Sequence, residues 1–221
     1  MRVPSAVSLA FLPILFASWV IAQSPASPYD SVDPLIGTAG GGNTFPGATL
    51  PFGMVQWSPD TNADAWYRYN EKQLYGFSLT HISGAGCGLY GDFAVLPTLE
   101  SLTTNPGVKF TAMAFDRRDE QAHPGYYKVT LTNGVRVELT VAERAGVARF
   151  TFPQGADMRV LINAGSSANS IADINENPHD HEGFGNHIEI KPDGSFTGWT
   201  SAGRFCVTKP TAALRWSSAR S

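Results

Sequence analysis

The dipeptide Asn133-Gly134 constrains the fold more tightly than any other short feature, because it separates two segments in which apolar and polar side chains alternate. The segments are residues 126–132 and 135–141, and both are rich in β-branched or aromatic residues. An Asn-Gly pair between two such runs is the strongest short-range hairpin signal, since a two-residue turn needs positive φ at both positions. The second segment places its apolar side chains on one face: Val135, Val137, Leu139 and Val141. We expect that face to be buried.

Short strands joined by turns also fit the composition, which combines 22 glycines and 15 prolines with 16% charged residues. Residues 32–61 are so rich in Gly and Pro that no regular helix fits there. A Pro192-Asp193-Gly194 turn joins two predicted strands, and no long segment shows sustained helical periodicity. Beyond the first hairpin, strands are predicted at residues 54–57, 79–82, 147–152, 159–163, 187–190 and 195–200. The predicted fold is all-β, a mostly antiparallel β-sandwich.

Residues 1–22 are predicted to be a signal peptide, because a basic start precedes an apolar stretch that Pro13 interrupts. Val20 and Ala22 are small residues at the two positions that signal peptidase reads, which places cleavage after Ala22. The alternative is an uncleaved membrane anchor, which needs about 20 apolar residues. We therefore expect a secreted protein without membrane association after cleavage, in which residues 23–32 form a polar lead-in.

The formal net charge is −3, which argues against a nucleic-acid partner. The two cysteines, Cys87 and Cys206, suggest one long-range disulfide in an oxidising compartment. Two buried thiols that never meet are an equal alternative. The spacing of the pair is not that of a zinc site.

Three segments could carry chemistry, and the first is the glycine-rich run Gly37–Ala48. It lacks the ending and the following helix of a nucleotide-binding loop. Clustered glycines allow close approach of the backbone, which suits a rim packed against another domain or a ligand.

The second segment, Gly76–Asp92, leads from a predicted strand into a loop with four glycines. It brings together several polar side chains: His81, Ser83, Cys87, Tyr90 and Asp92. Three interpretations remain open. Cys87 could be a nucleophile with His81 as its base, His81 could be a satisfied, half-buried histidine, or the group could contact a polar ligand in a cleft.

The third segment is His179-Asp180-His181-Glu182, with His187 nearby. Alternating histidines could bind a transition metal. The flanking Asn, Pro and Gly residues instead favour a solvated surface loop.

An ordered series of short motifs runs from Asp33 to Cys206. It includes Asp33-Pro34-Leu35-Ile36-Gly37-Thr38, Thr44-Phe45-Pro46-Gly47-Ala48, Pro51-Phe52-Gly53-Met54-Val55-Gln56, Ser58-Pro59-Asp60-Thr61, the Gly76–Asp92 segment, Pro124-Gly125-Tyr126-Tyr127, Arg149-Phe150-Thr151-Phe152-Pro153 and Gly203-Arg204-Phe205-Cys206. Together these motifs resemble the N-terminal domain of glycoside hydrolase family 92, the calcium-dependent exo-α-mannosidases, many specific for α-1,2 linkages, that trim N-glycan and related mannose chains.

The resemblance implies a galactose-mutarotase-like β-sandwich at residues 33–206, followed in the family by a larger (α/α)6 catalytic barrel. Inverting hydrolysis needs a carboxylic acid and a carboxylate base about 6.5–9.5 Å apart. In the family these carboxylates, and most contacts to Ca²⁺, come from the barrel. No acidic residue of this chain matches those motifs, so the expectation is no catalytic residue and no metal ligand here, with the barrel and α-mannosides as partners.

By resemblance, one surface of the sandwich faces the barrel and the terminal mannose. Its substrate-binding residues would be Tyr67, His81, Gly84, Gly86, Cys87 and Asp92. Its pocket rim would be Gly41, Asn43, Phe45 and Trp66. The chain departs from the family there, because many members have His at the positions of Asn43 and Leu79, and Gly at that of Trp66.

Residues 207–221 show no alternation or turn chemistry and are expected to be a divergent tail outside the sheet. A truncated gene model or a reading-frame error would explain such an end, and a genuine short paralogue is the alternative. The leading hypothesis is the N-terminal domain of a secreted α-mannosidase, inactive by itself. The alternatives are a stand-alone mannose-binding module and a non-functional fragment.

Overall fold

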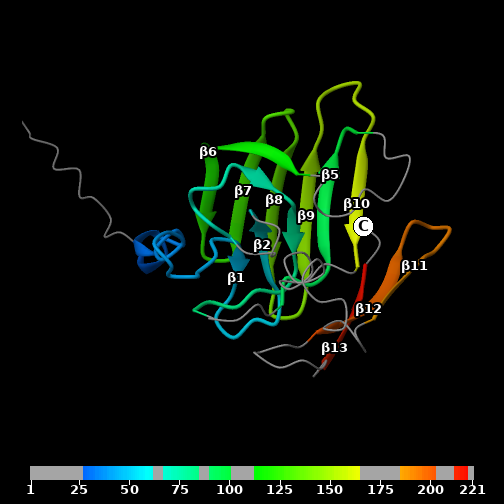
Figure 1. Ribbon diagram of the computed structural model, residues 1–221, viewed down its shortest axis with the longest axis horizontal. Coiled ribbons are helices and arrows are strands. Elements are labelled where there is room, and N and C mark those ends of the chain that lie inside the picture. Colours follow the sequence, from blue (N-terminus) through cyan, green and yellow to red (C-terminus); the bar gives the residue numbers. More distant parts are fainter. Residues whose placement is uncertain are drawn as a thin grey trace, which may run out of the picture.

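The protein is described by a computed structural model, which covers residues 27–61, 67–84, 90–100, 112–164, 185–202 and 212–218. Within these ranges it consists of β-strands and one short 3₁₀ helix, η1 (Pro28–Ser31) (Figure 1). All strand pairings are antiparallel. The predicted all-β, antiparallel class is confirmed. The predicted signal peptide, residues 1–22, lies outside the described residues.

The first sheet has the strand order β1-β2-β4-β5-β10. Its strands are β1 (Ala48–Thr49), β2 (Gln56–Asp60), β4 (Gly76–Ser78), β5 (Ala94–Thr98) and β10 (Arg159–Asn163). The predicted strand at 159–163 is confirmed with both of its ends, and the one predicted at 54–57 begins two residues later. The strand predicted at 79–82 is wrong. The chain leaves the sheet after Ser78 because His81 turns back to bond the side chain and the backbone of Gln56.

The second sheet has the order β3-β6-β7-β8-β9. Its strands are β3 (Gln73–Leu74), β6 (Met113–His123), β7 (Tyr126–Leu131), β8 (Arg136–Val141) and β9 (Gly146–Thr151). The hairpin predicted around Asn133-Gly134 is confirmed as β7–β8, but its turn is wider than expected. Of the two turn residues only Gly134 has positive φ, at 87°. Leu131 bonds Gly134 and Val135, which is the pattern of a three-residue loop with a bulge.

The third sheet is a three-stranded meander, β11-β12-β13, drawn in orange and red in Figure 1. Its strands are β11 (Asn186–Ile190), β12 (Phe196–Ala202) and β13 (Ala212–Ser217). The hairpin predicted through Pro192-Asp193-Gly194 is confirmed as β11–β12. The expectation that 207–221 stays outside the sheet is wrong for 212–217, which pairs with β12 at six positions. This segment is held in the sheet by Trp216, whose ring centroid lies 3.7 Å from that of Phe93.

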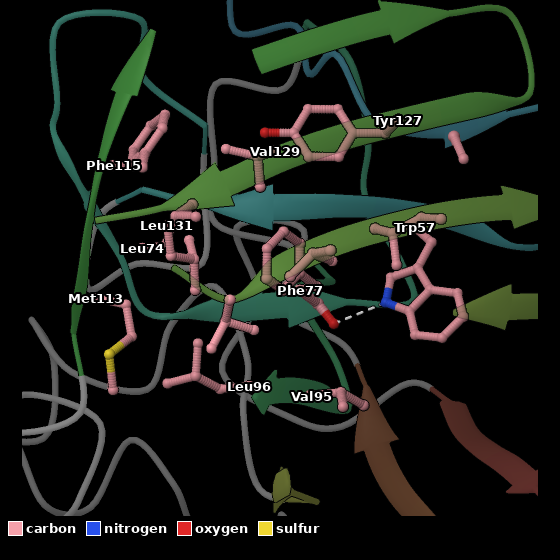
Figure 2. Packing of buried hydrophobic residues seen from close by; sticks show 14 of the residues in the cluster. Trp57, Leu74, Phe77, Val95, Leu96, Met113, Phe115, Tyr127, Val129 and Leu131 are labelled. Carbon is pink, nitrogen blue, oxygen red and sulfur yellow. Dashed lines mark hydrogen bonds between the residues drawn. The ribbon is translucent and has the colours of Figure 1, made fainter. Parts of the chain in front are cut away.

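The core lies between the first and second sheets and is filled from both. Figure 2 shows Phe77 of the first sheet packed among side chains of the second, and the Trp57 Nε1 donating to the Phe77 carbonyl at 2.9 Å. The most deeply buried large side chains are Leu74, Phe77, Leu96, Tyr127, Val129, Leu131, Val137 and Leu139. Burial of each such side chain contributes about 1.5–3 kcal/mol. The face of β8 expected to be buried is buried at Val135, Val137 and Leu139.

No helix in the described part of the chain is long and apolar enough to cross a lipid bilayer.

Candidate functional site

His81 is the centre of the site, and both of its ring nitrogens are engaged inside the protein. Nδ1 lies 2.9 Å from the backbone carbonyl of Gln56, which can only accept, so Nδ1 carries a proton. Nε2 lies 2.9 Å from Oδ1 of Asp60, another acceptor. When His81 is protonated both nitrogens donate, and the histidine and Asp60 form an ion pair; their side chains are 5% and 3% exposed.

Asp60 is saturated by donors from β4. Its Oδ2 accepts from the backbone N–H of Ser78 at 3.1 Å, and its Oδ1 accepts from the Ser78 hydroxyl at 2.8 Å. Hydrogen bonds of this kind satisfy a buried carboxylate without water. The arrangement favours the interpretation of His81 as a satisfied buried histidine over that of a base, because both of its nitrogens are already bonded to Gln56 and Asp60.

The glycine-rich segment folds over His81. The ring of Phe45 lies 5.0 Å from the His81 ring, and the carbonyl of Asn43 accepts from the backbone N–H of Gly84 at 2.9 Å. Asn43 has a left-handed φ of 51°, which is uncommon outside glycine. Gly41 also lies in this loop, and no atom lies within 4 Å of the place where a side chain would start. The loop is therefore fixed at Phe45, against His81, and at Asn43, against Gly84, and it is open at Gly41.

Asp92 closes the other side of the cluster, and one of its carboxylate oxygens has no partner among the described residues. Its Oδ2 accepts from the Thr80 hydroxyl at 3.0 Å, and its backbone N–H donates to the same hydroxyl. Oδ1 is buried and bonds nothing in the described part of the chain. Burial raises the pKa of Asp92 from its ordinary value to about 7, although the Thr80 hydrogen bond and the nearby His81 act to lower it. Tyr90 and Phe93, on either side, have positive φ.

Tyr67 belongs to a second, adjacent cluster and is 3% exposed. Its hydroxyl lies 2.8 and 2.9 Å from the two oxygens of Glu120, and it also accepts from Nη1 of Arg117. The Tyr127 hydroxyl donates to Glu120 at 2.7 Å. Burial, followed by the charge of Glu120, raises the pKa of Tyr67 far above its ordinary value. The hydroxyl of Tyr67 is thus committed to its own chain.

Arg117 holds this second cluster against the backbone. Its guanidinium donates to the carbonyls of Arg68, Tyr69 and Glu71 at 2.8, 2.6 and 2.8 Å, and to Glu120 at 2.8 Å. Tyr69 in turn donates its backbone N–H to the carbonyl of Thr38, at the start of the glycine-rich segment. The two clusters are linked through this contact.

Sequence reasoning missed Arg117 and Glu120. They stand in a run of charged residues on β6 that has the appearance of an exposed strand, Asp116-Arg117-Arg118-Asp119-Glu120. A shift of register between Phe115 and Glu120 turns both side chains inward. A long run of charged residues inside a strand was the signal in the sequence that could have indicated inward-facing charges.

The structure brings together five of the residues assigned by resemblance: Asn43, Phe45, His81, Gly84 and Asp92. Tyr67 lies in the neighbouring cluster, and Gly41 lies on the open part of the loop. The remaining assignments, Trp66, Gly86, Cys87 and Cys206, lie outside the described residues, as does the His179–Glu182 segment. The pairing of the two cysteines therefore stays a prediction.

The described acidic residues do not fit a calcium site. No group of three or more His, Cys, Asp or Glu side chains in the described ranges could hold a metal ion. Asp60 and Glu120 already have full sets of donors. Asp92 offers a single buried oxygen, whereas calcium takes six to eight oxygen ligands.

Comparison with known proteins agrees with this architecture. The profile of the glycosyl hydrolase family 92 N-terminal domain matches residues 31–215. An uncharacterized secreted glycosidase of Arthroderma benhamiae is 34% identical over 161 residues, which are 69% of this chain and 20% of the relative.

Solved structures show the same relationship. A family GH92 alpha-mannosidase from Bacteroides thetaiotaomicron superposes with a TM-score of 0.66 at 31% identity, covering 81% of this chain and 24% of the enzyme. A GH92 inverting mannosidase from the same organism gives a TM-score of 0.60 at 26% identity, covering 78% and 22% of the two chains. This chain spans between a fifth and a quarter of the relatives' length. It belongs to glycosyl hydrolase family 92, as that family's N-terminal β-sandwich domain.

Proposed function

We propose that this chain is the N-terminal part of a secreted α-mannosidase, in which it completes the pocket for the terminal mannose of an α-1,2-linked or related N-glycan chain. The observation that carries the proposal is the cluster around His81, where the glycine-rich loop is fixed by Phe45 and Asn43. A rigid rim of this kind suits a pocket that must close around a small polar sugar.

His81 acts in this proposal as the support of the rim, since both of its nitrogens are used by Gln56 and Asp60. Sugar contacts would come from the backbone of the loop, from the Phe45 ring and from the segment that contains Gly86 and Cys87. Thr80, which precedes that segment, bonds the residues that follow it, because its carbonyl accepts from Gly91 and its hydroxyl bonds Asp92. The ends of the segment are thereby brought together next to His81.

The chemistry of hydrolysis is assigned to the remainder of the longer protein. Asp60 and Glu120 are each fully bonded within their own clusters, and Asp92, in the cluster of Asp60, has one carboxylate oxygen bonded to Thr80 and the other buried. An acid and a base with water between them are therefore not expected from these residues. We assign calcium, which the family requires, to the remainder as well, and derive no step through it.

The 221-residue chain, incubated with α-1,2-mannobiose and calcium, is expected to release no mannose. The control is a full-length relative such as the Arthroderma glycosidase under the same conditions. Release of mannose by the purified chain would contradict the proposal. Sequencing the transcript beyond codon 221 tests the same point, because an open continuation into an α-rich region is expected.

Secretion is supported by the printed description of the Arthroderma relative as a secreted glycosidase. If residues 1–22 are a signal peptide, the protein recovered from a eukaryotic culture medium begins at Gln23. N-terminal sequencing decides this, and a chain that keeps Met1 in the membrane fraction would contradict it.

A second candidate function is a stand-alone mannose-binding module. The observation in its favour is that the His81 cluster is assembled from this chain's own residues. Calorimetry of the chain with mannobiose should then show heat that Phe45→Ala abolishes. Flat heats at millimolar sugar would reject the module and leave the pocket-completing role.

A further inference from the structure

The turn between β1 and β2 presents a phenylalanine in an unfavourable backbone conformation. Gly53 donates to the carbonyl of Leu50 at 3.0 Å, with Pro51 and Phe52 in the two central positions. Phe52 has a φ of 62°, the value that a type II turn requires at its second central position and that glycine supplies without strain. The chain places Phe there although Gly follows immediately.

The turn is held in place by its neighbours. Met54 donates its backbone N–H to the carbonyl of Glu143, in the turn between β8 and β9, at 2.7 Å. Leu50 lies against Gly125, in the turn between β6 and β7, so closely that a side chain on Gly125 would start 3.2 Å from it. The turn is thus a fixed feature of the lower end of the sandwich in Figure 1.

The side chains of this turn face outward. Phe52 is fully exposed, at 101% of its reference area, and Met54 is 62% exposed. Leu50 is also partly exposed, and we call these three residues the Phe52 surface. The exposed charges of Glu143 and Arg144 border it. An apolar centre with a polar rim is the usual anatomy of a protein interface, and strain held at such a place is a mark of function.

The Phe52 surface adjoins the candidate site. Thr49, the residue before Leu50, pairs with Gln56. Gln56 accepts hydrogen bonds from His81 through both its side chain and its backbone. A partner that covers Phe52 would therefore also border the rim around His81.

We propose that the Phe52 surface is the docking site for the part of the longer glycosidase chain that lies outside the matched segment. This inference rests on the proposed function. The matched segment covers 24% of the solved mannosidase, so about three quarters of that protein is available as the partner. Phe52 takes no part in the hydrophobic core of the described residues and is fully exposed there, so a partner is needed to bury it.

The first test uses the 221-residue chain by itself and the variant Phe52→Gly. Glycine removes the backbone strain and loses no buried contact, so the thermal midpoint of the isolated chain is expected to rise. In a full-length Arthroderma glycosidase that carries this chain in place of its matched segment, the same variant is expected to lower the midpoint. A rise in both proteins would overturn the proposal.

The second test identifies what covers the surface. A photoreactive benzoylphenylalanine replaces Phe52 in the graft. In the control it replaces Met158, which directly precedes β10 and is 69% exposed. Crosslinks from position 52 into the remainder of the glycosidase, absent from position 158, are expected. Crosslinks to a second copy of the chain, or none, would overturn the proposal. If the graft is not secreted, the remainder is co-expressed as a separate polypeptide and the same outcomes decide.

Hydrolysis of mannobiose by the graft separates the two proposals. An inactive graft that still crosslinks would reject the proposed function and keep the docking site. An active graft that neither crosslinks nor responds to Phe52→Gly would keep the function and reject the docking site.

Discussion

Asp60 and His81 form a buried ion pair, with Nε2 of the histidine 2.9 Å from Oδ1 of the aspartate. Ser78 and Gln56 complete the bonding of the two side chains, so β2, β4 and the loop after β4 meet at this pair. The pair thus links the sheet to the candidate rim through buried side chains.

Replacing Asp60 by Asn is expected to lower the free energy of unfolding by about 3–5 kcal/mol, because the buried charge of His81 is left without its partner. Urea unfolding of the full chain measures this. Ser78→Ala removes one donor to the same carboxylate and should cost about 1 kcal/mol. Equal losses in the two variants would show that the pair carries no charge.

The raised pKa of Asp92 should make the free energy of unfolding fall as the pH rises. Its folded pKa of about 7 lies above the ordinary 3.8, so the folded protein favours the neutral acid. The stabilisation is complete below about pH 4 and is lost as the pH rises through 7, and at about 1.4 kcal/mol per pH unit it amounts to at most about 4 kcal/mol.

Asp92→Asn should therefore match the wild type at about pH 4 and below, and exceed it in unfolding free energy at pH 8. Thr80→Val, which removes the donor to Oδ2, should move the wild-type transition to higher pH. A wild-type protein whose Asp92-dependent stability is the same at pH 5 and pH 8 would contradict the assignment.

Arg117→Lys should loosen the segment that carries Tyr67. Lysine cannot donate to the carbonyls of Arg68, Tyr69 and Glu71 together, so the loss of these charge-assisted hydrogen bonds should cost about 2 kcal/mol. Trypsin should also cleave faster after Arg68.

The matched control is Arg118→Lys, the next residue along β6. Arg118 is exposed and pairs with Asp116, so its variant should leave both the unfolding free energy and the cleavage rate unchanged. Similar behaviour of the two variants would show that the contacts of Arg117 are dispensable.

Gly47→Ala is expected to prevent stable folding, because its side chain would start 2.3 Å from the backbone of Trp57 and Ser58. Gly155→Ala meets no atom within 4 Å and changes only the strain of a positive φ, at a cost of about 1 kcal/mol. Thermal unfolding of both variants separates steric exclusion from strain. Equal midpoints would contradict the close approach at Gly47.

The hairpins could be predicted from sequence because their signals are local. The alternation on both sides of Asn133-Gly134, and the turn at Pro192–Gly194, locate β7–β8 and β11–β12 without knowledge of the rest. The strand at 212–217 could not be predicted in this way. Its support comes from Phe93 and Phe196, which contact Trp216 from distant parts of the chain.

The sequence predicts which residues form the site, but it does not show which of their polar atoms are already hydrogen-bonded within the protein. The motifs named His81 and Tyr67, and nothing local shows that their polar atoms are already bonded to Asp60 and Glu120. Those partners come from other strands, and Glu120 turns inward only because the register of β6 shifts. Long-range hydrogen bonding decides which residues remain free for a ligand.

The hydroxyls that surround Glu120 give the protein an optical signature. Burial and the charge of Glu120 raise the pKa values of Tyr67 and Tyr127 well above the ordinary 10. In an alkaline titration these two of the seven tyrosines should remain protonated, and so add nothing to the tyrosinate absorbance, while exposed phenols ionise. A cooperative rise in their tyrosinate absorbance at higher pH would mark unfolding of the cluster around Glu120. Ultraviolet absorbance alone can therefore report whether the contacts of Arg117 in this cluster are intact.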